Sequence, residues 1–228
     1  MQWRSRTWSA AADGLPPSDR IASVRIYLIT DAAPLLRPIE KFLEEAVAGG
    51  VGMVQLREKS LDDMSLLDVA RRCASTCRRL GVPFIVNDRP DIALLADADG
   101  VHLGQEDLPV ADVRRIVGSD AVIGLSTHSR AQVDAARSSS VDYIGVGPIW
   151  ATPTKPGRAA AGLELVRYAA AHAAVPFFAI GGIAPSTVAD VIGAGAKSVS
   201  VLRWIAQSGE PRGAAQAMMR ALSLAGDV

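Results

Sequence analysis

The chain of 228 residues is 49% hydrophobic, which is enough for one domain with a sizeable core. Its 24 basic residues balance its 24 acidic residues, so the composition excludes the broad positive field of a protein that binds nucleic acid or an anionic membrane surface. No apolar stretch approaches the roughly 18–20 residues that span a bilayer.

We expect an N-terminal extension over residues 1–22 and a single folded domain over residues 23–228. The beginning of the chain is polar, carries Ser and Arg, and lacks the apolar segment of a secretory signal. It is interpreted as a mobile tail or a helical extension.

From Ile26 onward, short β-branched runs alternate with longer segments of helical periodicity. Such short, uninterrupted apolar runs are typical of parallel strands that are buried on both faces. The predicted strands are Ile26–Thr30, Met53–Leu56, Pro83–Val86, Gly100–Leu103, Ala121–Gly124, Tyr143–Val146, Phe177–Ile180 and Ser198–Val201. Eight strand–helix units favour a (β/α)8 TIM barrel over a doubly wound sheet. The Rossmann and Walker A glycine motifs are absent from the sequence.

The segment from Ser60 to Gly81 illustrates the helical pattern. Ser60 and Asp63 resemble a capping box, and Gly81 predicts the end of the helix. Apolar residues recur at i, i+3, i+4 and i+7, as on one face of an amphipathic helix. This face carries Leu66, Leu67, Ala70, Cys73, Ala74 and Cys77.

Cys73 and Cys77 are the only cysteines. Because no histidine is nearby, we interpret this pair as two buried small side chains rather than as a zinc site or a disulfide. The usage fits a reducing cytoplasm, and we expect a cytoplasmic protein.

In a TIM barrel, the chemistry gathers at the carboxyl ends of the strands. After the second predicted strand, Arg57 and Lys59 stand two residues apart and can point the same way in extended backbone. Two converging cations suit a phosphate or a diphosphate. The alternative is ordinary surface charge, with Glu58 as a partner.

Asp88 and Asp107 follow the third and fourth predicted strands at equivalent positions. Neighbouring strands lie about 5 Å apart, so both carboxylates can reach one ion, and this pattern suits Mg²⁺. The alternative is that the two aspartates cap helices that begin near Pro90 and Pro109.

The segment Gly147–Gly162 is long and punctuated by Pro and Gly, and it carries Thr152, Thr154 and Lys155. We interpret it as a lid over a phosphorylated substrate, with a plain exposed loop as the alternative. Gly181-Gly182 follows the seventh strand, where barrels commonly bind phosphate through backbone N–H groups.

His102, His128 and His172 are interpreted as structural residues rather than as catalytic bases. No serine or cysteine carries a nucleophile signature such as G-x-S-x-G.

Four stretches, "VQLREK", "FIVNDRPDIALLADADGVHLGQEDLP", "YIGVGPIWATPTKPG" and "AIGGI", resemble the thiamine-phosphate synthase family in order and spacing. The resemblance covers the chain from about Ile26 to Ala206. It implies a (β/α)8 barrel that joins 4-amino-2-methyl-5-(diphosphooxymethyl)pyrimidine to 4-methyl-5-(2-phosphooxyethyl)thiazole, with release of diphosphate. Small-molecule substrates are then the expected partners, with homo-oligomerisation left open.

The resemblance also implies roles for individual residues. Asp88 and Asp107 would hold Mg²⁺, and Arg57, Lys59, Ser126 and Lys155 would be catalytic. The pyrimidine diphosphate would be bound by Gln55, Leu56, Arg57, Glu58, Lys59, Asn87, Ser126 and Lys155. The thiazole phosphate would be bound by Thr152, Pro153, Thr154, Gly182, Leu202 and Arg203.

The expected mechanism is a dissociative loss of diphosphate, which needs no protein nucleophile. The family usually carries a serine where this chain has Arg203, and the N-terminal extension is unmatched. A thiazole tautomerase of the same barrel family is one alternative, although such relatives generally lack the paired N-D-R and G-Q-E-D motifs. A thiazole-phosphate-binding regulator without turnover is another.

Overall fold

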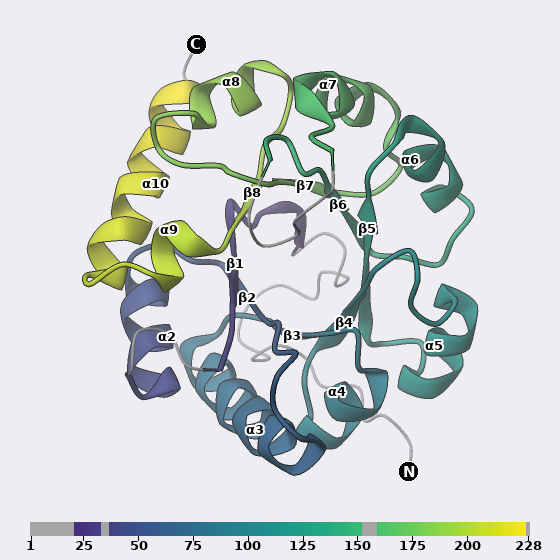
Figure 1. Cartoon of the computed structure of the whole chain (residues 1–228), viewed down its shortest axis with the longest axis vertical. Coiled ribbons are helices and arrows are strands. Elements are labelled where there is room, and N and C mark those ends of the chain that lie inside the picture. The colour runs from purple at the N-terminus through teal and green to yellow at the C-terminus, as the bar shows by residue number, and fades with distance from the viewer. Residues whose placement is uncertain (1–20, 33–36, 152–158, 227–228) are drawn as a thin grey trace.

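The computed structural model describes residues 21–32, 37–151 and 159–226. Parallel strands form a closed barrel in chain order, with β1 paired to both β2 and β8, and helices surround it (Figure 1). The strands are β1 (Ile26–Thr30), β2 (Met53–Leu56), β3 (Phe84–Asn87), β4 (Gly100–Leu103), β5 (Val122–Thr127), β6 (Tyr143–Val146), β7 (Phe177–Ile180) and β8 (Val199–Val201). The predicted (β/α)8 TIM barrel is confirmed.

The helices alternate with the strands, and two of them follow β8. They are α2 (Ile39–Ala48), α3 (Asp63–Leu80), α4 (Pro90–Ala96), α5 (Val110–Val117), α6 (Arg130–Ala136), α7 (Gly162–His172), α8 (Val188–Gly193), α9 (Arg203–Ala206) and α10 (Pro211–Gly226). The last helix, α10, packs between α8 and α2 and closes the outer ring (Figure 1).

Three strands differ from their predicted bounds. The ladder of β3 begins at Phe84 because Pro83 has no N–H to donate. Strand β5 continues past Gly124 to Thr127, where it still pairs with β6. Strand β8 begins at Val199, one residue late, and the hydroxyl of Ser198 just before it donates to the Val24 carbonyl oxygen.

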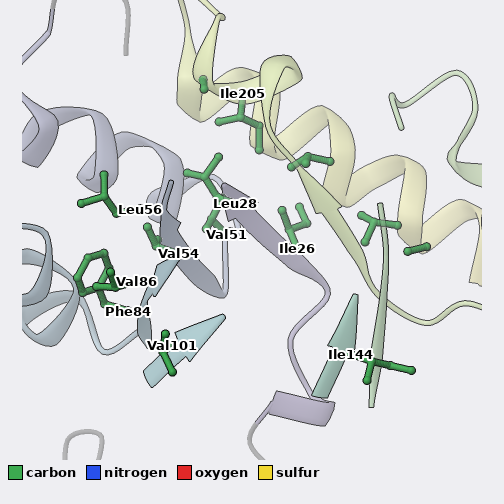
Figure 2. Close-up of a cluster of buried hydrophobic side chains, with 14 of the residues drawn as sticks. Ile26, Leu28, Val51, Val54, Leu56, Phe84, Val86, Val101, Ile144 and Ile205 are labelled. Carbon is green, nitrogen blue, oxygen red and sulfur yellow. The ribbon is translucent and has the colours of Figure 1, made fainter. Parts of the chain in front are cut away.

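The alternation of side chains along the strands divides the core in two. Outward-facing residues such as Leu28, Val54 and Val86 pack against the helices (Figure 2). The inward-facing residues form a separate cluster that fills the lower barrel. Its members are Ile21, Val24, Tyr27, Met53, Ile85, Val122, Tyr143 and Phe178.

Helix α3 follows its predicted face but has a different cap. Asp62, rather than Ser60, is the N-cap, and its side chain accepts a hydrogen bond from the Ser65 N–H at 3.0 Å. The predicted capping box is therefore wrong, because the helix begins at Asp63 itself. Gly81 ends the helix in the left-handed region, with φ of 72°, as predicted.

The two cysteines are free and buried on α3, which confirms their interpretation. Burial raises the pKa of the Cys73 thiol to about 12. Of the predicted extension, only its last two residues are described, and Ile21 is fully buried beneath the barrel. Among the described helices, none is both long enough and apolar enough to cross a membrane.

Acidic side chains at the amino ends of the strands hold the barrel together. Asp99 accepts a hydrogen bond from the Phe84 N–H, and Asp142 accepts one from the Ile123 N–H, both at 2.8 Å. Arg114 reaches from α5 to Asp142 at 3.0 Å and donates to several nearby carbonyl oxygens. These acids at the lower rim are structural.

Replacing Arg114 with alanine is expected to lower the free energy of unfolding by about 2–3 kcal/mol, because partly buried acceptors would lose their donor. Arg115 is the matched control, since its side chain is 83% exposed and its ion pair among the described residues stays within α5, to Asp112. Arg115→Ala should change stability by less than about 0.5 kcal/mol. Urea denaturation measures both variants, and equal losses would contradict the clamping role of Arg114.

Candidate active site

A cavity of about 390 Å³ opens at the carboxyl ends of the strands. Its lining comes from strand ends far apart in the sequence, as expected for this fold. The predicted site residues that line it are Gln55, Arg57, Asn87, Ser126, Gly182, Leu202 and Arg203. The barrel thus brings together residues that span most of the chain.

Three of the predicted binding residues that the structure describes do not line the cavity: Leu56, Glu58 and Lys59. The side chain of Leu56 is buried in the core between the barrel and the helices. The Glu58 carboxylate accepts hydrogen bonds from the N–H groups of Ala32, Lys59 and Ser60. Against the desolvation that burial imposes, the hydrogen bond from the Ser60 hydroxyl and those from the N–H groups lower the pKa of Glu58. Glu58 therefore organises the loop after β2.

Asp88, Asp107 and Lys59 converge beside the cavity. Lys59 Nζ lies 3.1 Å from Asp88 Oδ2, and Asp107 Oδ2 accepts a hydrogen bond from the Gly104 N–H at 2.6 Å. Burial, and then the neighbouring Asp88 carboxyl, raise the pKa of Asp107 despite that hydrogen bond. Because the Asp88 carboxylate is close enough to disfavour the charge on Asp107, a cation between the two would stabilise the site.

Neither aspartate caps a helix. The N-cap of α5 is Pro109 and that of α4 is Arg89, and neither helix has a side-chain cap. The capping alternative is therefore wrong. Asp107 instead closes the turn after β4, and Asp88 adopts a left-handed backbone with φ of 63°. Aspartate tolerates this region better than most residues, and such backbones concentrate at functional sites.

The acidic pair fits a magnesium ion by its donor chemistry. Mg²⁺ typically takes one or two carboxylates and completes its shell with water and substrate phosphate oxygens. Within the described ranges no group of three or more potential metal ligands occurs. Asp88 and Asp107 alone would supply the protein ligands, and substrate would supply others.

The opposite side of the mouth is built from backbone. Gly181 and Gly182 have φ of 109° and 71°, in the left-handed region. A Cβ at Gly181 would come within 2.6 Å of Pro148, so a side chain does not fit there. The short helix α9 begins at Arg203, beside these glycines in the cavity lining. Loops after strands seven and eight with a short extra helix form the common phosphate site of such barrels.

The first described residues of the predicted lid are anchored to the end of β7, and the last ones are anchored to the beginning of the lid. The N–H of Ile149 donates to the Ile180 carbonyl oxygen at 2.8 Å, and that of Trp150 donates to the Gly181 carbonyl oxygen at 3.2 Å. On the far side, Ala161 N–H donates to Pro148 at 2.7 Å. Thr152, Pro153, Thr154 and Lys155 lie outside the described residues.

Sequence reasoning missed the polar floor of the cavity. His102 is buried inside the barrel, with Nδ1 3.0 Å from Tyr143 Oη and Nε2 2.9 Å from Ser126 Oγ. His128 also lines the cavity, whereas His172 is exposed on α7. The available signal was the period of two along β4, since His102 pairs in register with the inward-facing Asn87.

Fold and site together define the class of protein. It is a (β/α)8 barrel whose upper rim carries an acidic pair with a lysine on one side and a glycine loop on the other. The family model described as thiamine monophosphate synthase matches residues 26–205. The chain belongs to the thiamine monophosphate synthase family.

Known proteins of this family resemble the chain over most of its length. A thiamine-phosphate synthase of Acidothermus cellulolyticus is 52% identical over 86% of this chain and 93% of that protein. One of Nostoc punctiforme is 48% identical over 82% of this chain, which spans only about half (52%) of that longer relative. The solved thiamine phosphate pyrophosphorylase of Pyrococcus furiosus is 28% identical, with a TM-score of 0.81 over 90% of this chain and 98% of that chain.

The raised pKa of Asp107 predicts how stability depends on pH in metal-free buffer. The folded protein holds this proton more tightly than the unfolded chain, so the wild-type free energy of unfolding falls as pH rises from the unfolded pKa through the folded pKa. Asp107→Asn removes this titration, and the variant should gain stability relative to wild type across the same window. Urea unfolding from about pH 4 to 7 measures the difference. If the free energy of unfolding of the wild type instead rose with pH relative to that of Asp107→Asn, the raised pKa of Asp107 would be contradicted.

Proposed function

We propose that the protein is a thiamine-phosphate synthase. It would join 4-amino-2-methyl-5-(diphosphooxymethyl)pyrimidine to 4-methyl-5-(2-phosphooxyethyl)thiazole and release diphosphate. The observation that carries the proposal is that, in a member of this family, an acidic pair with a lysine and a glycine turn stand at opposite sides of the barrel mouth. Asp88, Asp107 and Lys59 lie on one side, and Gly182 and Arg203 lie on the other.

The pyrimidine diphosphate would occupy the side built from β2, β3 and β4. Arg57 lines the cavity there, and Lys59 stands at Asp88 with a side chain that is 60% exposed. Both cations would bind diphosphate oxygens. Mg²⁺ held by Asp88 and Asp107 would neutralise part of the diphosphate charge. The two carboxylates argue for the ion, because without a cation they would repel the diphosphate.

The reaction we propose is dissociative. The bond between the pyrimidine methylene carbon and the diphosphate oxygen breaks, and its electron pair leaves with the diphosphate. The lone pair of the thiazole nitrogen then forms the new C–N bond. This scheme needs no protein nucleophile, and Arg57, Lys59 and Lys155 would stabilise the departing charge. Exclusion of water from the cation would fall to the loop that carries Lys155.

The thiazole phosphate would occupy the opposite side. Backbone N–H groups near Gly182 and Leu202 would bind its phosphate, as in other barrels with a short helix after strand eight. Arg203, exposed at the rim of the cavity, would add a charge-assisted hydrogen bond. Thr152, Pro153 and Thr154 would complete this side. The free cysteines support the predicted cytoplasmic location.

The purified chain, mixed with both substrates and Mg²⁺, is expected to form thiamine phosphate and diphosphate in equal amounts. A chelator should stop both products together. Failure to release diphosphate in a Mg²⁺-dependent reaction would contradict the proposal.

Asp88→Asn is expected to lower kcat/KM by on the order of 10²-fold or more, because the diphosphate would lose its cation site. Asparagine tolerates the left-handed backbone at this position, so the loop should keep its shape. Thiazole phosphate should still bind, as calorimetry would measure. Asp112→Asn is the control, since that carboxylate is exposed on α5 and, within the part of the chain that the structure describes, pairs with Arg115. Loss of thiazole phosphate binding in Asp88→Asn would contradict the two-site division.

Arg203→Ser introduces the residue that the family usually carries. The KM for thiazole phosphate should rise by about three- to tenfold, because an exposed guanidinium contributes a moderate charge-assisted bond. The kcat at saturation should stay near that of the wild type. Arg212→Ser, on the exposed side of α10, is the control. An unchanged KM in Arg203→Ser would show that Arg203 does not bind the thiazole phosphate.

A further inference from the structure

A continuous chain of hydrogen bonds crosses the floor of the cavity. The amide Nε2 of Gln55 donates to Tyr27 Oη, which lies 2.7 Å from Tyr143 Oη. Tyr143 Oη lies 3.0 Å from His102 Nδ1, and His102 Nε2 lies 2.9 Å from Ser126 Oγ. The chain therefore links two cavity-lining residues, Gln55 and Ser126, through three aromatic side chains buried inside the barrel.

The number of protons fixes the direction of this chain. Each hydroxyl group has one proton to donate. The buried Tyr27 O–H needs an acceptor, and its recorded partners among the described residues are Gln55 Nε2, which donates, and Tyr143 Oη. The proton of Tyr27 therefore goes to Tyr143, and the proton of Tyr143 goes to His102 Nδ1. A neutral imidazole that accepts at Nδ1 carries its proton on Nε2, from which it donates to Ser126. The hydroxyl proton of Ser126 then remains for a ligand in the cavity.

Burial supports this direction. Both phenols are inside the barrel, and burial raises the pKa of Tyr27 and of Tyr143 well above the ordinary range. Each therefore stays a neutral O–H donor. Buried chains of this kind polarise one another, so each bond strengthens the next.

Side-chain packing holds this chain of hydrogen bonds in place. Phe178 meets the rings of Tyr27 and Tyr143 edge to face, at centroid distances of 5.1 and 5.5 Å. A Cβ on Gly124 would lie 2.1 Å from Tyr143 Cζ and 2.5 Å from His102 Nδ1. Glycine at this point of β5 is what admits both rings. Ser126 is thus oriented before any ligand arrives, which is the condition for efficient binding or catalysis.

We propose that His102 is a positioning residue, held by Tyr143 as the neutral Nε2–H tautomer, that makes Ser126 a hydrogen-bond donor to a ring nitrogen of the pyrimidine substrate. A pyrimidine ring nitrogen accepts a hydrogen bond and has no proton to give, so it matches this donor. The identity of the ligand rests on the proposed function, whereas the tautomer and the direction of the chain do not.

The tautomer is tested on the unliganded protein by ¹⁵N NMR of the histidine rings at neutral pH. The His102 signals are identified by their loss in His102→Gln. They are expected to show a protonated Nε2 and an unprotonated Nδ1. Tyr143→Phe should shift the Nδ1 signal, whereas Tyr168→Phe, on the outer helix α7, should not. A protonated Nδ1 in the wild type would overturn the proposal.

The role of Ser126 is tested with the pyrimidine diphosphate and two analogues, each with a CH group in place of one ring nitrogen. Wild type should bind the parent about tenfold more tightly than one of the analogues, as expected for one hydrogen bond. Ser126→Ala should lose this preference. His102→Leu should lose most of it, and His102→Gln should retain it, because glutamine can present an N–H where Nε2 lies.

A purely structural role for His102 predicts a different result. His102→Leu would then lower the melting temperature and leave the preference between parent and analogue intact, which would overturn the proposal. If neither the parent nor the analogues bind, the proposed function and the ligand assignment both fail. The NMR result would still decide the tautomer.

Discussion

The pairing of β1 with β8 is the constraint on which the rest of the structure depends. It closes eight parallel strands into one barrel, so that every strand ends at the same rim. Closure also fixes which side chains face inward, because their direction alternates along each strand. Gln55, His102 and Ser126 therefore meet inside one cavity although they come from different strands. Without closure, the acidic pair and the glycine loop would not share a mouth.

The two rims of the barrel use the same residue type for opposite purposes. At the lower rim, Asp99 and Asp142 accept backbone N–H groups, and these bonds stabilise the fold. At the upper rim, Asp88 and Asp107 stand close enough that the neighbouring charge adds to burial in raising the pKa of Asp107. This repulsion costs stability in the absence of a cation. Such a local conflict is expected where a site is organised for a ligand that is not part of the chain.

The sequence predicted the barrel well because its signals are local. Short apolar runs and helical periodicity located all eight strands, and the strand ends supplied seven predicted site residues that line the cavity. Non-local features were out of reach. Gly124 was predicted to be the last residue of a strand. In the fold it lies inside β5, where the absence of a side chain makes room for Tyr143 and His102 from other strands. Helix capping by Asp88 and Asp107 stayed open as an alternative to metal binding, whereas in the fold Asp107 closes a turn onto Gly104. In both cases the partner becomes visible only once the chain is folded.

The central claim is that diphosphate binds on the side of the mouth that carries Asp88 and Asp107, together with a divalent cation. The most direct measurement is anomalous diffraction from crystals grown with diphosphate and Mn²⁺ in place of Mg²⁺. The anomalous peak is expected between the two carboxylates, with diphosphate oxygens completing the coordination shell and Arg57 and Lys59 in contact with the anion. A diphosphate bound at Gly181-Gly182 with no metal at the aspartates would contradict the claim.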